Sequence, residues 1–194
     1  MYRTEQKYFG SYFDNISKIE ILGVSKQHPS RKINSIYFDT NDLSFFRLSE
    51  EGSTPRQKIR LRWYKDFDKL KIECKYKELE FSRKLIFDIG EFNKVKIEQN
   101  IKKFKNLKIF PKLQVSYLRK YFKDKKSQTR YTLDYNITFY KIDNNFKSIG
   151  FSKSKFFIIE LKKNINNNEY LSASILGSNR SRFSKYCEGI KEFY

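Results

Sequence analysis

Several residue types that build common catalytic and metal sites are scarce in this chain. Its two cysteines, Cys74 and Cys187, have the spacing of neither a metal site nor a disulfide framework. The one histidine, His28, lies in a His-Pro-Ser loop, where we expect no catalytic role. No apolar run approaches about 18 residues, so we expect no signal peptide, no membrane span and a reducing, cytoplasmic setting.

Acidic residues are also scarce relative to basic ones. The 194 residues contain 41 Lys and Arg against 22 Asp and Glu, a net charge of +19 that predicts an anionic partner. Alanine occurs only at Ala173, while Lys, Asn, Ile, Phe and Tyr are abundant, as in AT-rich coding sequence. The positions of the charges are therefore better evidence of function than their number.

The chain length predicts one domain, spanning residues 1–194, with a substantial core. Alternating or strongly β-branched and aromatic segments predict strands at 1–8, 33–40, a hairpin within 56–77, 80–88, 113–122, 129–139 and 156–162. Apolar spacing predicts helices at 11–22, 42–48, 91–104 and 182–193, the second capped by Thr40 or Asn41. We therefore expect a mainly β (α+β) fold, an antiparallel sheet that curls or closes, with few helices.

The hairpin within 56–77 has the clearest pattern. Its first strand alternates three apolar residues (Ile59, Leu61 and Trp63) with three basic ones (Lys58, Arg60 and Arg62). A solvated face of a sheet is the ordinary explanation for one such strand. The same alternation recurs on six strands, however, and together these place ten cations and four acids opposite apolar faces. The cations are Arg3, Lys7, Lys58, Arg60, Arg62, Lys75, Lys77, Arg119, Arg130 and Lys162; the acids are Glu5, Glu73, Asp134 and Glu160.

If these strands close into a barrel with the charged faces inward, the lumen becomes a cationic tunnel. Two like charges about 4 Å apart repel by roughly 4 kcal/mol at an effective dielectric near 20. A threaded polyanion would relieve this repulsion, and a carboxylate among the cations could hold a divalent metal or form local ion pairs.

Eight short motifs also follow one another in order along nearly the whole chain. They are Arg3-x-Glu5-x-Lys7-Tyr8, Ser35-Ile-Tyr-Phe-Asp-Thr40, Lys58-Ile-Arg60-Leu-Arg62-x-Tyr64, Glu73-x-Lys75, Tyr117-x-Arg119, Arg130-Tyr-Thr-Leu-Asp134, Ile159-Glu160-Leu-Lys162 and Ser184-Lys185-Tyr186. In this order they resemble the catalytic domain of vacuolar transporter chaperone (VTC) proteins, which are polyphosphate polymerases of the triphosphate tunnel metalloenzyme superfamily.

The resemblance implies a closed antiparallel β-barrel that binds ATP or triphosphate, and polyphosphate, in a basic tunnel. It implies transfer of the terminal phosphoryl group of ATP to a growing polyphosphate chain with Mn²⁺ or Mg²⁺. Glu160 matches the metal-binding glutamate. Phosphate-binding positions are matched by Lys7, Arg60, Arg62, Lys75, Arg119 and Lys185, with Lys58, Tyr117, Arg130 and Lys162 as further tunnel-lining positions. The catalytic set expected from this match is Arg60, Arg62, Lys75, Arg119 and Glu160.

The chemistry of the residues agrees with this family. Phosphoryl transfer depends mainly on positioning and charge neutralisation, which Arg, Lys and one metal ion supply. Two alternatives remain open. The same site could hydrolyse tripolyphosphate or nucleoside triphosphates, and a non-catalytic module could bind polyphosphate or nucleic acid, since basic strands interleaved with aromatic residues also suit single-stranded nucleic acid.

Overall fold

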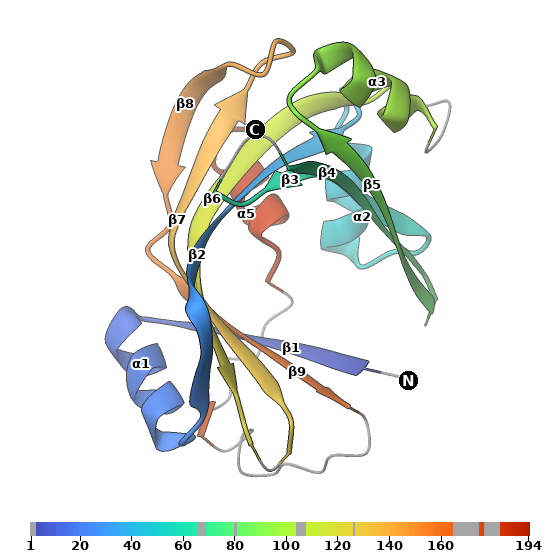
Figure 1. Ribbon diagram of the computed structural model, residues 1–194. Helices are drawn as coiled ribbons and strands as arrows, with labels where there is room; N and C mark the ends of the chain where they lie inside the picture. Colours follow the sequence, from blue (N-terminus) through green and yellow to red (C-terminus); the bar gives the residue numbers. More distant parts are fainter. Residues whose placement is uncertain are drawn as a thin grey trace. The chain divides into compact units, whose positions relative to one another are not determined.

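The computed structural model describes residues 3–65, 69–79, 81–103, 108–125, 127–164, 175–176 and 183–194, and the side chains of residues 3, 4, 12–14, 163 and 164 lie outside this description. In the described part the chain forms nine strands and four helices, labelled in Figure 1. The strands are β1 (Arg3–Gly10), β2 (Ser25–Asp39), β3 (Arg56–Trp63), β4 (Leu70–Glu78), β5 (Phe81–Gly90), β6 (Phe110–Lys123), β7 (Arg130–Ile142), β8 (Ser148–Lys153) and β9 (Phe157–Asn164). The helices are α1 (Tyr12–Ile21), α2 (Ser44–Glu51), α3 (Lys94–Lys102) and α5 (Lys185–Lys191).

All nine strands belong to one hydrogen-bonded sheet. Its strand order is β1-β9-β7-β6-β2-β3-β4-β5, and β8 pairs with β7 outside this path. The pairings with a defined register are antiparallel. Within the described residues this order has β1 and β5 as its two ends and does not close through hydrogen bonds. The mainly β, antiparallel fold is therefore confirmed, and the closed barrel stays a prediction.

The chain divides into two compact units. Unit 1 comprises residues 1–32, 117–137 and 153–183, and unit 2 comprises residues 33–116, 138–152 and 184–194. The core of unit 1 lies where α1 packs on the sheet, and contains Ile19 from α1 with Tyr131, Leu133, Ile159 and Leu161 from β7 and β9.

The core of unit 2 lies under α2 and α3. Ile59, Leu61 and Trp63 from β3 are all at most 4% exposed, and they cluster with Phe45 of α2 and Ile97 of α3. Figure 1 shows α3 beside β4 and β5, consistent with this packing. The apolar half of the β3 alternation is therefore the core-facing half, and it fixes which side chains of β3 point the other way.

Most predicted strands are present, with boundaries shifted by one to three residues. Two strand segments were not predicted. β2 extends back to Ser25 through exposed residues, because only its second half, residues 33–39, is buried and carries an apolar signal. β8 is a short strand in which Ser148, Ile149, Phe151 and Lys153 are exposed. Its sequence therefore has no alternation of buried apolar and exposed polar residues that would predict a strand.

The helices begin later than predicted. The N-cap position of α2 is Leu43 rather than Thr40 or Asn41, but the predicted Thr40 hydroxyl does accept a hydrogen bond from the backbone N–H of Ser44 at 2.9 Å. Leu43 itself has a left-handed conformation and makes no side-chain cap hydrogen bond.

The buried Asp39 carboxylate also accepts hydrogen bonds from the backbone N–H groups of Phe45 at 2.9 Å and Phe46 at 3.0 Å. A carboxylate at a helix N-terminus also interacts favourably with the helix dipole. A residue that stabilises this helix start therefore comes from the end of β2.

Candidate functional site

The first concentration of charge lies on the face of β3, β4 and β5 that points away from the core of unit 2. The strand register places Lys58 opposite Lys75, and Lys75 opposite Lys84, so three lysines cross the sheet in one row. Alternation places the neighbouring rows on the same face. We call this surface the cationic face; its charged members are Arg56, Lys58, Arg60, Arg62, Lys71, Glu73, Lys75, Lys77, Lys84 and Asp88.

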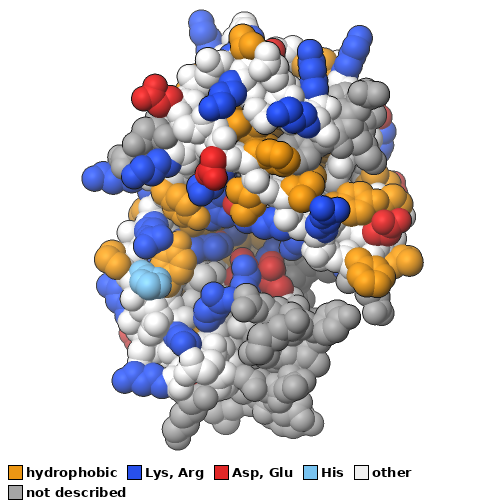
Figure 2. Space-filling view, turned by 45° about the vertical axis from the view of Figure 1, so that its right-hand side comes forward, with side chains coloured by type: hydrophobic (Ala, Val, Ile, Leu, Met, Phe, Trp, Pro, Cys, Tyr) orange, Lys and Arg blue, Asp and Glu red, His pale blue; other side chains and the backbone are white. Residues whose placement is uncertain are grey.

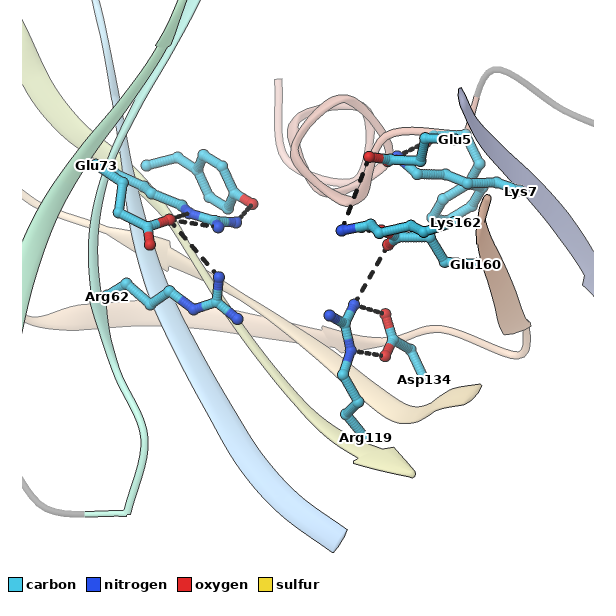
Figure 3. Close-up of polar contacts among 11 residues, drawn as sticks. Glu5, Lys7, Arg62, Glu73, Arg119, Asp134, Glu160 and Lys162 are labelled. Atoms are coloured by element: carbon cyan, nitrogen blue, oxygen red, sulfur yellow. Dashed lines mark hydrogen bonds and ion pairs between the residues drawn. The ribbon is translucent and has the colours of Figure 1, made fainter. Parts of the chain in front are cut away.

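Glu73 is the centre of the cationic face. Its Oε2 accepts from Arg60 Nε at 2.8 Å and Nη2 at 2.5 Å, and lies 3.6 Å from Arg62 Nη1 (Figure 3). Its Oε1 accepts from Lys84 Nζ at 2.7 Å. Burial of Glu73 raises its pKa, but the charges of Arg60, Lys84 and Arg62 outweigh burial and lower the pKa to about 2. This carboxylate therefore remains ionised and holds three cations together.

One hydrogen-bond donor of Arg62 has no acceptor among the described residues. Its side chain is 13% exposed, and its Nε is a buried atom that makes no hydrogen bond among the described residues. A buried N–H without a partner costs about 1–3 kcal/mol. An anion bound at Arg62 would satisfy this donor.

A second layer of residues fixes Arg60. Its Nη1 donates to the hydroxyl of Tyr37 at 3.2 Å, and the Tyr37 ring stacks on Tyr186 with ring centroids 5.1 Å apart. The hydroxyl of Tyr186 in turn donates to the buried Asp39 carboxylate. Burial and this carboxylate both raise the pKa of Tyr186, so its hydroxyl stays protonated. Arg60 is thus anchored through two aromatic rings to the residue that holds the start of α2.

Lys58, on β3, and Lys185, at the start of α5, are far apart in the sequence but both lie near Arg60 and Tyr37. Lys58 Nζ donates to the hydroxyl of Ser184 at 2.9 Å, and Ser184 also caps α5. Burial raises the pKa of Tyr37, but the charges of Arg60, Lys185 and Lys58 outweigh it and lower the pKa below its ordinary value. Arg60 therefore contacts the Tyr37 hydroxyl directly, and Lys58 and Lys185 add positive charge near it.

The second concentration of charge lies in unit 1 and contains nearly as many acids as bases. We call it the mixed network; its members are Glu5, Lys7, Arg119, Arg130, Asp134, Glu160 and Lys162. Arg119 binds the fully buried Asp134 through two bonds, Nε to Oδ1 at 2.5 Å and Nη2 to Oδ2 at 2.7 Å. Burial lowers the pKa of Arg119, but Asp134 and Glu160 outweigh it and raise the pKa well above its ordinary value.

Glu160 and Glu5 bind the remaining lysines of the mixed network (Figure 3). Lys162 Nζ lies 2.7 Å from Glu160 Oε1 and 3.9 Å from Glu5 Oε2. Lys7 Nζ lies 3.3 Å from Glu5 Oε1 and donates to the backbone oxygen of Phe183 at 3.1 Å. Arg119 Nη2 lies 3.4 Å from Glu160 Oε2, so Glu160 joins Arg119 to Lys162.

The suitability of Glu160 for a metal follows from these contacts. Among the described residues no group of three or more His, Cys, Asp and Glu side chains is placed to hold a metal ion. A Mg²⁺ or Mn²⁺ ion bound largely by substrate phosphates needs only one or two carboxylates. Glu160 is a buried carboxylate that could serve as such a ligand, but Lys162 pairs with its Oε1 and Arg119 with its Oε2, so a metal ion would compete with these two cations.

The site residues predicted from sequence fall into these two groups. Lys58, Arg60, Arg62 and Lys75 lie on the cationic face with Lys185 beside it; Lys7, Arg119, Arg130, Glu160 and Lys162 lie in the mixed network. Lys75 and Arg130 are exposed. Tyr117 is buried, and its ring lies 5.4 Å from the Arg119 guanidinium. Lys84 and Tyr37 were not predicted as site residues, although they contact Glu73 and Arg60 directly.

Charge on the rest of the surface is less organised. Figure 2 shows Lys and Arg side chains spread over much of the described part of the visible face, among hydrophobic and polar ones. Basic composition alone therefore marks no site. None of the helices in the described part of the chain combines the length and the apolar character needed to cross a bilayer.

Comparison with known proteins adds a family and a fold. The sequence matches the family model of the VTC domain over residues 6–194. No curated protein matches the chain. Similar solved structures include the PH1819 protein from Pyrococcus horikoshii OT3, with 13% identity, a TM-score of 0.58 and coverage of 98% of this chain and 99% of that one.

Two further solved structures extend this likeness. The PH1012 protein from Pyrococcus horikoshii OT3 has 18% identity and a TM-score of 0.57, covering 96% of this chain and 98% of that one. A Vibrio parahaemolyticus protein described as a candidate adenylate cyclase has 13% identity and a TM-score of 0.53, covering 98% of each chain. At these identities the likeness shows a shared fold alone.

Proposed function

Because this chain belongs to the VTC-domain family, which the eight sequence motifs predicted, we propose that it is a polyphosphate polymerase. In the reaction, a terminal oxygen of a polyphosphate chain forms a bond to the γ-phosphorus of ATP, the bond to the β,γ-bridging oxygen breaks, and ADP leaves. The substrates are ATP, or another triphosphate, and polyphosphate.

The observation that carries this proposal is the convergence of Arg60, Arg62 and Lys84 on the single carboxylate of Glu73. Three cations placed within reach of one pair of oxygens can equally hold the oxygens of a phosphoryl group. The Nε of Arg62, which makes no hydrogen bond among the described residues, adds a buried donor that a phosphate oxygen could accept from. Charge-assisted hydrogen bonds to phosphate are the strong ones, and Arg makes them in pairs.

Each basic residue of the two groups is then assigned a role. Arg60 and Arg62 hold phosphoryl oxygens at fixed positions, since Glu73 and Tyr37 orient Arg60. Lys58, Lys75, Lys84 and Lys185 add point charges along the phosphate chain. In the mixed network, we assign phosphate binding to Lys7, Arg119, Arg130 and Lys162. Arg119 is pre-positioned by Asp134, so it can neutralise charge that develops during transfer without reorganising.

Glu160 is the residue that would hold the Mn²⁺ or Mg²⁺ cofactor. The ion, when bound, neutralises charge on the reacting phosphates. Glu5, Glu73 and Asp134 are instead assigned to orienting the basic side chains, because each forms ion pairs with one or more of them.

The finer features of the fold belong to the same proposal. We assign the sheet to a closed tunnel barrel, as one domain over residues 1–194, because the family is built in this way. We assign the protein to the cytoplasm, where the buried free thiols of Cys74 and Cys187 would stay reduced.

One experiment separates the proposal from its two alternatives. Purified protein is incubated with ATP and Mn²⁺ or Mg²⁺, and ADP, free phosphate and long polyphosphate are then separated. A polymerase yields ADP with long polyphosphate, and a triphosphatase or nucleoside triphosphatase yields free phosphate instead. A non-catalytic binder of polyphosphate or nucleic acid yields neither, across divalent metals and acceptors.

The variant Glu160→Gln tests the metal role within this assay. It keeps the shape of the side chain and removes its charge, so we expect turnover to fall at least about 100-fold, or about 2.7 kcal/mol, with triphosphate binding retained. The matched control is Glu98→Gln, which changes an exposed glutamate on α3 and should leave turnover unchanged. Equal turnover of Glu160→Gln and wild type would assign Glu160 a purely structural role.

A further inference from the structure

Unit 2 contains a cavity outside the two charged groups of residues. It lies between α3, the start of β6 and the turn that joins β7 to β8, and Figure 1 shows this turn beside α3. Its volume is about 660 Å³, within the range of roughly 300–1,000 Å³ that is typical of small-molecule sites. We call it the α3 pocket.

The α3 pocket and the cationic face lie on opposite faces of the sheet. Tyr37 and Phe38 are neighbours on β2, so their side chains point to opposite faces. The Tyr37 hydroxyl accepts from Arg60 of the cationic face, whereas Phe38 belongs to the core of unit 2 and lines the pocket. A ligand in the pocket would therefore leave the cationic face open to phosphates.

The walls of the α3 pocket are apolar. They are formed by Phe38, Ile101, Ile109, Phe110, Pro111 and Phe146. Phe146 has a φ of 64°, a left-handed conformation that is strained for a bulky side chain. Its ring lies edge-to-face with Phe38 and with Phe92, with centroids 6.1 Å and 5.4 Å apart. These contacts hold an aromatic ring in the wall of the pocket against the strain of the turn.

The charged side chains that line the pocket are mostly basic. Lys94, Lys102 and Lys108 are exposed at its edge, and Lys94 Nζ donates to the Asn145 side-chain oxygen at 3.0 Å. Lys102 and Lys108 form no ion pair or hydrogen bond with any residue that the structure describes. Glu98 is the one acid among the described lining residues, and we assign it no contact with a ligand. Three cations against one acid favour an anionic group at the edge of an apolar cavity.

We propose that the α3 pocket binds a long-chain carboxylate of the fatty-acid class. The apolar tail lies among the phenylalanine and isoleucine side chains, where burial of its surface is favourable. The carboxylate stays at the edge, where Lys102 and Lys108 extend their apolar stems along the pocket and bring their charged ends to it. This site is separate from the proposed phosphate site and does not depend on the proposed function.

The lining favours an acyl chain over a nucleotide, which also combines a flat apolar body with an anionic group. The polar atoms of a buried base need hydrogen-bond partners. Besides the three lysines, the described lining offers only the side chains of Asn144 and Glu98 as polar groups, and both are exposed. An acyl chain has no polar atom in its buried part, so it needs no such partner.

The test titrates dodecanoate, below its micelle concentration, into the full chain by calorimetry. We expect wild type to bind it at least about tenfold more tightly than dodecyltrimethylammonium, which has the same tail and the opposite charge. The variant Lys102→Gln/Lys108→Gln should lower dodecanoate affinity about tenfold, the loss expected for one charge-assisted contact. Ile109→Trp should lower it at least tenfold, because the larger side chain occupies the cavity. The control Lys153→Gln/Lys155→Gln makes the same charge change at two exposed lysines outside the lining and should stay within about twofold of wild type.

The remaining outcomes also decide the proposal. Wild type that binds no dodecanoate, or binds dodecyltrimethylammonium equally well, would overturn it, as would equal losses in the two double-lysine variants. If Lys102→Gln/Lys108→Gln weakens binding of ATP or ADP but not of dodecanoate, the pocket is a nucleotide site and the fatty-acid assignment is rejected. The lysine variants change exposed side chains only, so they decide the question even if Ile109→Trp fails to fold. Dodecanoate binding as expected without polyphosphate synthesis would reject the proposed function alone.

Discussion

The cationic face of unit 2 and the mixed network of unit 1 use the same kinds of side chain at different ratios. The described members of the cationic face are eight bases and two acids, whereas those of the mixed network are four bases and three acids. Like charges directly opposite on neighbouring strands destabilise a sheet, and Lys58, Lys75 and Lys84 are arranged in this way. In the mixed network most charges have a partner of opposite sign, so its ion pairs fix the positions of its side chains. In the cationic face most bases lack such a charge balance, so a bound anion would stabilise this face more.

The largest expected effect concerns the stability of the mixed network. Arg119→Ala removes the bidentate partner of the fully buried Asp134. Breaking a buried pair by removing one partner costs about 3–5 kcal/mol, so urea unfolding should show a loss of this size. Arg130→Ala, at an exposed cation of the same network, is the control and should change the unfolding free energy by less than about 0.5 kcal/mol. Similar losses in the two variants would contradict a self-supporting network.

The next effect is a pH dependence of stability that originates in the cationic face. The pKa of Glu73 is lowered from 4.5 to about 2 in the folded protein, against its burial, by Arg60, Lys84 and Arg62. Its ionised form therefore stabilises the fold above about pH 4.5, and this contribution is lost as pH falls toward 2. The difference corresponds to on the order of 3 kcal/mol.

Comparison of wild type with Glu73→Gln isolates this contribution from the other carboxyl groups. The unfolding free energies of the two proteins should differ most at pH 5 and above, and should converge between pH 4.5 and pH 2. Parallel curves over that range would show that Glu73 is not the titrating group.

The third effect concerns ligand affinity. The double variant Arg60→Ala/Arg62→Ala should weaken tripolyphosphate binding by at least about 2 kcal/mol, because charge-assisted hydrogen bonds contribute roughly 1.5–3 kcal/mol each. Affinity of the wild type should also fall steeply with added salt, by analogy with phosphates of nucleic acids. Arg47→Ala is the matched control, since Arg47 is an exposed arginine outside the cationic face and pairs with Asp42. Unchanged affinity of the folded double variant in calorimetry would reject Arg60 and Arg62 as ligands.

Sequence alone predicted the parts of the molecule that local alternation determines. The alternation in β3 predicted that Ile59, Leu61 and Trp63 share one face and that Arg60 and Arg62 lie on the other, and the alternating burial of this strand confirms it. The exposed start of β2 and the short β8 carry no such signal, because a strand that is exposed on both faces has no apolar period.

The residues missed in the site depend on contacts between distant segments. Lys84 joins the site because it lies opposite Lys75 and forms an ion pair with Glu73. The sequence of β5 alone does not specify which residues of β4 it pairs with. Tyr37 lies in an apolar run typical of a core strand, yet its hydroxyl accepts from Arg60. In the same way, Asp39 stabilises the start of α2 from the end of β2. Such roles follow from strand pairing and helix packing, which a local pattern does not specify.

The smallest expected effect tests whether Tyr37 positions Arg60 on the cationic face. Tyr37→Phe keeps the ring stacked on Tyr186 and removes only the oxygen that accepts from Arg60 Nη1 at 3.2 Å. One neutral acceptor for a charged donor contributes about 1 kcal/mol, so kcat/KM should fall about fivefold with little change in unfolding free energy. Tyr186→Phe should do the reverse, since it removes a donor to the buried Asp39 carboxylate and therefore lowers stability. If both variants lose turnover and lose the same amount of stability, the two tyrosines act as one packing unit. That result would reject a positioning role for Tyr37. A selective loss of kcat/KM in Tyr37→Phe would instead show that the ordering of Arg60, beyond its charge, is used in the reaction.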